Sequence, residues 1–176
     1  GLLLVAAVCA GLIAPCAFMD FPTPSAVPTS PDTSSASPSE DEQATAGATP
    51  MGEGLTVGYT TYCVWRAWYS DRLSANPYIN KRANATWLII DVAVRNNDAT
   101  ARMVPPFKLV DEKGAVYEAS ADGMIIENAF GVLQTLNPSV TKQGLVVFDV
   151  PRDRTYRLKV SGGYWSRDDG FIQIVP

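Results

Sequence analysis

The chain has 176 residues, of which 47% are hydrophobic and 18% are charged, and its formal net charge is −4. Five of the 18 acidic residues precede residue 50, whereas all 14 basic residues follow it. The later part of the chain therefore carries 13 acids against 14 bases, a net charge near +1. A nearly neutral module lacks the basic surface of a nucleic-acid-binding protein, which excludes nucleic acid as a partner.

Histidine is absent from the sequence. This removes the commonest general base, the Ser–His and Cys–His nucleophile pairs, and every histidine-ligated metal site. Two of the three cysteines, Cys9 and Cys16, lie in the first 19 residues, so Cys63 is alone in the rest of the chain. An all-cysteine zinc site is then out of reach. We expect no catalytic residues, no metal and no cofactor.

Residues 1–19 contain no charged side chain, and three interpretations of this apolar segment stay open. As a transmembrane anchor, a helix of about 20 residues would match a hydrocarbon core of ~30 Å. As a lipoprotein signal, Ile13–Cys16 has the shape of a lipobox that would place a lipid on Cys16, although Pro15 is a poor fit. As a cleaved signal, Val8–Ala10 is an acceptable site. All three interpretations place the rest of the chain outside the cytoplasm.

Residues 20–52 have the composition of a disordered linker. Six of the 13 prolines fall between residues 21 and 50, among many serines and threonines. Proline removes backbone donors and the small polar residues offer little to bury, so no packed structure is expected. The segment is typical of a semi-extended spacer between the N-terminal segment and a folded domain.

Alternation with a period of two residues begins after Gly54 and is typical of β-strands. The clearest example is the strand expected over residues 87–95, in which one face is wholly apolar: Leu88, Ile90, Val92 and Val94. Other strands are expected near residues 55–63, 107–109, 116–117, 145–150, 156–160 and 171–175. Gly114 supplies the positive φ that the turn between the strands at residues 107–109 and 116–117 needs. About seven short strands without a convincing helix predict an all-β, two-sheet antiparallel sandwich over residues 53–176.

Two stretches give no clear prediction. Residues 69–82 form a long polar loop without a period, and residues 119–137 contain Met124–Ile126, which fits either a strand or an irregular crossover.

Four blocks of sequence resemble one bacterial extracellular family: residues 87–97, 107–120, 136–151 and 156–163. This family of unknown function occurs in secreted and membrane-tethered lipoproteins and is similar to the mycobacterial immunoprotective extracellular antigen. The resemblance implies an immunoglobulin-like sandwich and an extracellular location. It provides no catalytic or ligand-binding residues. The chain departs from the family at Ser139, where the family usually has glycine after the proline.

Trp65, Arg66, Trp68 and Tyr69 form the most unusual local cluster and are a candidate binding patch, because exposed Trp and Tyr beside Arg are typical of binding hot spots. The alternative is that the two tryptophans fill the sandwich core or cap its end. Four acids surround the predicted hairpin turn, Asp111, Glu112, Glu118 and Asp122. They lack the regular spacing of a calcium-binding loop, so we expect no metal there.

The sequence therefore predicts a non-catalytic, membrane-tethered extracytoplasmic binding or interaction module of a bacterial cell envelope. Its expected partners are the membrane, through residues 1–19, and a protein or envelope polymer. Secretion is the alternative location. The alternative function is a structural or accessory subunit packed permanently on a larger membrane or surface assembly.

Overall fold

The computed structural model describes residues 47–74, 78, 81–164 and 166–176. The predictions for the apolar segment, for the lipid on Cys16 and for residues 20–46 of the linker lie outside the described residues. Within the described part of the chain, no helix is long and apolar enough to cross a membrane.

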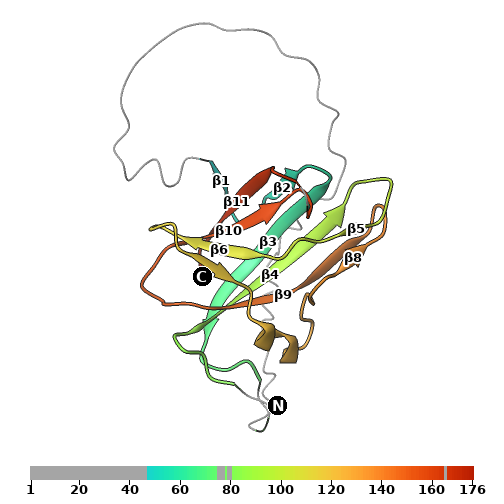
Figure 1. The fold of residues 1–176 in the computed structure, drawn as a ribbon. Coiled ribbons are helices and arrows are strands. Elements are labelled where there is room, and N and C mark those ends of the chain that lie inside the picture. Colours follow the sequence, from blue (N-terminus) through green and yellow to red (C-terminus); the bar gives the residue numbers. More distant parts are fainter. Residues whose placement is uncertain (1–46, 75–77, 79–80, 165) are drawn as a thin grey trace, which may run out of the picture.

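The described residues form two β-sheets that pack face to face, together with one short strand pair and almost no helix (Figure 1). The first sheet has the strand order β1 (Ala48–Thr49), β11 (Asp169–Ile174), β10 (Tyr156–Ser161), β6 (Lys108–Asp111) and β7 (Val116–Glu118). The second has the order β2 (Gly54–Val57), β3 (Thr60–Ser70), β4 (Trp87–Asn96) and β9 (Thr141–Asp149). The separate pair is β5 (Arg102–Met103) and β8 (Thr135–Leu136). The predicted all-β sandwich is confirmed.

The strands differ from the prediction mainly at the start of the domain. The strand expected near residues 55–63 is a hairpin of β2 and β3, because Gly58 takes a φ of 56° and reverses the chain. β3 then runs on to Ser70, with a bulge between Val64 and Arg66 where it pairs with β4. β1, which falls within the predicted linker, adds a parallel strand to β11.

The core between the sheets contains the apolar face that the alternation predicts. The four residues of that face on β4 are fully buried: Leu88, Ile90, Val92 and Val94. They share one cluster with Leu109, Leu158 and Ile172 of the opposite sheet.

A second apolar cluster lies on the outer face of β4. Its buried members are Leu73, Trp87, Ile89 and Val147, and its partly buried members include Trp68, Ile125 and Ile126. The indole N–H of Trp87 donates a hydrogen bond to the Lys81 carbonyl at 3.1 Å. β4 is therefore buried on both faces.

The segment after β7 covers part of this outer face. Residues 121–125 form a 3₁₀ helix, η1 (Ala121–Ile125), and the Ser120 hydroxyl accepts a hydrogen bond from the Asp122 N–H at 3.2 Å. The Ser120 N–H in turn donates to the Val147 carbonyl of β9 at 2.7 Å. Met124 and Ile125 thus belong to a 3₁₀ helix, and Ile126 caps its end. The segment is neither the strand nor the irregular crossover that the sequence allowed.

The β6–β7 hairpin is held by Asp111, whose side chain is fully buried. One carboxylate oxygen accepts hydrogen bonds from the N–H groups of Ala115, at 2.8 Å, and Lys113, at 3.0 Å. The other accepts from the Arg154 guanidinium at 2.5 Å and from the Tyr117 hydroxyl at 3.3 Å. Burial alone would raise the pKa of Asp111, but the hydrogen bonds from Arg154 and from the two backbone groups outweigh it and hold the pKa below its ordinary value.

We predict that Asp111→Asn removes part of the pH dependence of folding. The pKa of Asp111 is lower in the folded state than its unfolded value of about 4. Its ionised carboxylate therefore contributes fully to the free energy of unfolding above about pH 4, and this contribution is lost as the pH falls through the folded pKa. Urea unfolding should show the variant less stable than wild type at pH 7, with the gap narrowing as the pH falls below about 4. A gap that stays constant over this range would contradict the assignment.

The turn before β9 contains a residue in the left-handed region. Ser139 has a φ of 60° and follows Pro138, as in a type II turn, and the Val140 N–H donates to the Asn137 carbonyl at 3.1 Å. The Ser139 N–H donates to the Asn96 carbonyl at 2.9 Å, which joins the turn to the end of β4. The family's usual glycine would suit this conformation, whereas a side chain here costs about 1–2 kcal/mol.

We predict that Ser139→Gly stabilises the domain by about 0.5 kcal/mol, since the strain that is removed exceeds the extra chain entropy that glycine loses on folding. Thermal or urea unfolding would measure the gain. Ser139→Ala keeps the strained φ and serves as the control that shows no gain. A glycine variant less stable than wild type would contradict the prediction.

Candidate binding pocket

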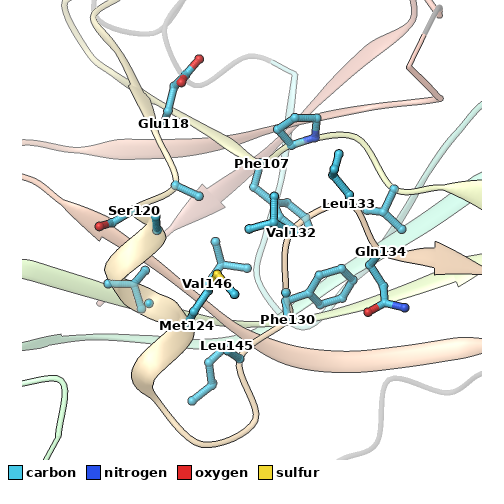
Figure 2. Close-up of a pocket in the computed structure, with 18 of the residues that line it drawn as sticks. Phe107, Glu118, Ser120, Met124, Phe130, Val132, Leu133, Gln134, Leu145 and Val146 are labelled. Atoms are coloured by element: carbon cyan, nitrogen blue, oxygen red, sulfur yellow. The ribbon is translucent and has the colours of Figure 1, made fainter. Parts of the chain in front are cut away.

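An apolar pocket of about 340 Å³ opens between the β6–β7 side of the first sheet and β9 of the second. Residues that line it include Phe107, Met124, Phe130, Val132, Leu133 and Val146. Figure 2 shows Met124 on one side of the pocket, with Phe130 and Leu133 on the other. This volume lies in the range of sites that bind small molecules.

The floor of the pocket is rigid because its aromatic side chains belong to the core. Phe107 and Phe130 are 7% and 2% exposed, and their rings meet edge to face with centroids 5.2 Å apart. Phe107 follows Pro105 and Pro106, which fix the backbone that leads into β6.

The rim, in contrast, exposes large apolar side chains to solvent. Met124 is 62% exposed, Val132 66% and Leu133 60%. Leu133 also has a φ of 55°, a conformation that is unusual for a bulky residue. Strained backbone of this kind occurs often at ligand sites, which makes the rim a candidate contact surface.

One wall of the pocket is tied to β9 by backbone hydrogen bonds. The Phe130 N–H donates to the Leu145 carbonyl, and the Leu145 N–H donates to the Asn128 carbonyl, both at 2.9 Å. Gly144 lets the two backbones approach, because a Cβ at this position would lie 2.7 Å from the Phe130 Cα.

The polar groups at the rim are already engaged with one another. Lys108 pairs with Glu118 at 3.5 Å, and the side chains are 44% and 79% exposed. Lys142 lies beside the lining rather than in it: its ammonium donates to the side-chain oxygen of Gln134 at 2.5 Å and lies 5.5 Å from the centroid of the Phe130 ring.

The structure places the four residues of the predicted binding patch on β3, but not on one face. Arg66 is exposed, lies 4.9 Å above the Trp68 ring and pairs with Asp91 at 3.3 Å on the outer face. Tyr69 packs against the core between the sheets, and the Arg152 guanidinium carbon lies over the Tyr69 ring, 5.3 Å from its centroid. Trp65 occupies the bulge, and its buried indole N–H has no hydrogen-bond partner in the described structure. Arg66 and Trp68 are thus brought together, and Tyr69 is separate from them.

The four acids near the β6–β7 hairpin are not gathered around a common point. Asp111 is bound by Arg154, Glu112 accepts from the Thr155 N–H, Glu118 pairs with Lys108, and Asp122 pairs with Lys81. Among the residues that the structure describes, no group of three or more Asp, Glu, Cys or His side chains could hold a metal ion.

Residues 49–170 match the model of the family described as a domain of unknown function, DUF4352. The chain belongs to this family. The match runs from β1 into β11, so the DUF4352 domain takes in both sheets and the pocket. None of the curated proteins compared with the chain matches it.

Solved structures similar to this DUF4352 domain include three bacterial proteins. The yjhA protein from Bacillus subtilis is 15% identical, with a TM-score of 0.56 over 72% of this chain and 99% of that one. A "putative lipoprotein (ycdA)" from Bacillus subtilis is also 15% identical, with a TM-score of 0.54 over 69% of this chain and 38% of that one. The secreted protein MPT63 from Mycobacterium tuberculosis is 16% identical, with a TM-score of 0.50 over 74% of this chain and 99% of that one. The likenesses show a shared fold, and the predicted similarity to the mycobacterial antigen is confirmed.

Sequence reasoning missed the pocket altogether. Its lining comes from several separate segments between residues 104 and 147 that only the sheet register brings together. The one local signal is Val132-Leu133, an apolar pair between Gly131 and Gln134 in a loop without strand periodicity. Solvent-exposed apolar pairs in loops are candidate contact residues.

We predict that Gly144→Ala destabilises the domain by about 1–3 kcal/mol, because the new methyl group must displace the backbone of residues 128–130. The same displacement should break the hydrogen bond from Phe130 to Leu145 and deform the pocket wall. Urea unfolding and amide hydrogen exchange at Phe130 would measure both effects. Thr141→Ala, an exposed change on the same strand, is the control and should alter stability by less than about 0.5 kcal/mol.

Proposed function

We propose that this DUF4352 chain is a membrane-tethered, extracytoplasmic binding module of a bacterial cell envelope, that it is not an enzyme, and that its ligand-binding surface is the pocket between β6–β7 and β9. The single observation that carries this proposal is an apolar cavity with a rigid aromatic floor and exposed apolar residues at its rim, one of which, Leu133, has a strained backbone. Such cavities are the usual form of small-ligand sites.

The location outside the cytoplasm is supported by the N-terminal sequence and by the similar structures. Residues 1–19 are uncharged and apolar, as in an anchor or an export signal. The neighbours with the same fold include a protein described as a lipoprotein and a secreted protein. Attachment by a spanning helix fits this chain better than a lipid on Cys16, because Pro15 fits a lipobox poorly.

We further assign the sandwich to the immunoglobulin-like class. The strand orders β3-β4-β9 and β11-β10-β6-β7 correspond to the A-B-E and G-F-C-C′ orders of that class. Tyr156 lies at the start of β10, and its hydroxyl donates to the Pro151 carbonyl at 2.7 Å. This is the arrangement of the tyrosine corner that is typical of immunoglobulin-like domains.

A binding role agrees with the position of the pocket relative to the tether. The linker enters the first sheet at β1, on one edge, and the pocket adjoins β7, on the other edge of the same sheet. At about 4.8 Å per strand, the four spacings between these edges separate them by about 19 Å. The pocket therefore lies at the opposite edge of this sheet from β1.

The proposal that the chain is not an enzyme is supported by its buried acids, which are engaged in hydrogen bonds within the domain. Asp91 accepts from Arg66 at 3.3 Å and from the Gln143 amide at 2.8 Å, and Asp111 is bound by Arg154 and two backbone N–H groups. Both carboxylate oxygens of each acid already accept hydrogen bonds within the domain, and the sequence has no histidine to act as a base.

The test is to purify the full chain from the membranes of its own cells in mild detergent and to analyse it by native mass spectrometry. We expect wild type to carry a bound molecule that Ala119→Trp lacks, because Ala119 is exposed and lines the pocket. Ala99→Trp, at an exposed position outside the pocket lining, is the matched control and should keep the molecule.

Equal loading of all three proteins, or none in wild type, would contradict pocket binding. Recovery of the chain from the cytoplasmic fraction would contradict the tether. A protein partner present at fixed stoichiometry in wild type and in Ala119→Trp alike would favour the permanent accessory subunit instead.

A further inference from the structure

We propose that the pocket holds the alkyl chain of a single-chain anionic lipid, with the acidic head group beside Lys142. The inference rests on the proposed function in one respect, because it takes this pocket as the binding site.

The interior of the pocket favours a ligand with an apolar body. The Ser120 hydroxyl is bonded to the Asp122 N–H, and the Gln134 side chain to Lys142 and to the Thr135 carbonyl. These lining side chains have their hydrogen bonds within the protein, so a polar ligand body would lose water without gaining partners. A hydrocarbon body has no hydrogen bonds to water to lose, and it gains free energy when its apolar surface is buried.

The size of the pocket suits one alkyl chain. A volume of about 340 Å³ lies near the lower end of the range of small-molecule sites. A single alkyl chain therefore suits the space better than a lipid with two chains. Beyond the interior, the exposed side chains of Met124, Val132 and Leu133 can pack against the part of the chain that leaves the pocket.

The charge beside the pocket selects an acidic head group. Lys142 is half-buried over the Phe130 ring, and its ammonium bonds to a neutral amide oxygen rather than to an acid. Among the described residues, no carboxylate forms an ion pair with Lys142, so its positive charge is not neutralised there. Glu118, a carboxylate in the lining, pairs with Lys108, and Figure 2 shows Glu118 and Gln134 on opposite sides of the pocket. A head group at Lys142 thus gains an ion pair and avoids this acid.

A peptide that adds as a strand is a poorer occupant, because the neighbouring edge of β9 is already in use. The Leu145 N–H and carbonyl bond to Asn128 and Phe130, and the Val147 carbonyl accepts from Ser120. β-strand addition depends on free backbone groups along an edge. A lipid needs none.

The proposal is tested on the full chain in nanodiscs of zwitterionic phosphatidylcholine, with a diazirine analogue of dodecanoate as the photolabel. Peptide mapping should place the label within residues 104–147 of wild type. Unlabelled dodecanoate should compete more strongly than dodecanol, and dodecyltrimethylammonium should compete least.

Lys142→Gln should raise the concentration of dodecanoate needed for half-maximal competition by about twofold to fivefold, the range for one partly exposed ion pair. The same variant should leave competition by dodecanol unchanged. Lys113→Gln removes an equal charge at the exposed β6–β7 turn and is the matched control, with no expected effect. Ala119→Trp should lose pocket labelling.

Equal competition by dodecanoate and dodecanol, or no response to Lys142→Gln, would overturn the anionic head group. Absence of label from residues 104–147 would overturn the lipid itself. If the purified chain nevertheless carries another molecule that Ala119→Trp lacks, the binding function stands and only the lipid assignment fails.

Discussion

The rest of the structure depends on the burial of β4 on both of its faces. One face meets the opposite sheet, as in any sandwich, but the other carries Trp87 and Ile89, which also have to be covered. Leu73 and Ala83, from the chain after β3, and Ile125 and Ile126, at the end of η1, contribute to that cover. The Ser120 N–H, just before η1, donates to the Val147 carbonyl of β9, and Ser120 and Met124 also line the pocket. The pocket therefore adjoins the segment that covers the second apolar surface.

The charges inside the molecule divide into two kinds. Asp111 and Asp91 are buried acids with basic partners and further hydrogen bonds, which is the arrangement that makes a buried charge tolerable. Lys142 differs, because its closest partners are an amide oxygen and an aromatic ring. An external negative charge could consequently form an ion pair with Lys142 on the side of the domain that holds the pocket.

Much of the fold could be predicted from the sequence, because strand alternation reports directly on burial. Residues 88–94 and 156–160 alternate as they do because one face of each strand fills the core. The hairpin of β2 and β3 could not be predicted in this way, since the apolar alternation of Leu55 and Val57 continues through Tyr59 without a break. The bulge at Trp65 gives no signal either, and it decides which neighbours share a face. For that reason the candidate patch was only partly predictable, and Tyr69 lies opposite Trp68. The pocket depends on register between distant segments, which local patterns do not contain.

The parallel pairing of β1 with β11 has a mechanical consequence for any force that acts through the linker. β1 is two residues long and lies at the edge of its sheet, so a pull on Gly47 breaks few hydrogen bonds before the strand separates. Once the hydrogen bond from the Gly52 N–H to the Val64 carbonyl also breaks, the chain from Gly47 to Glu53 can extend to a length of about 23 Å, at roughly 3.3 Å per residue. The hairpin of β2 and β3 and the buried core behind it take the load next. Under such a force, β1 would therefore detach first and lengthen the linker, while the rest of the sandwich, with its pocket, stays folded.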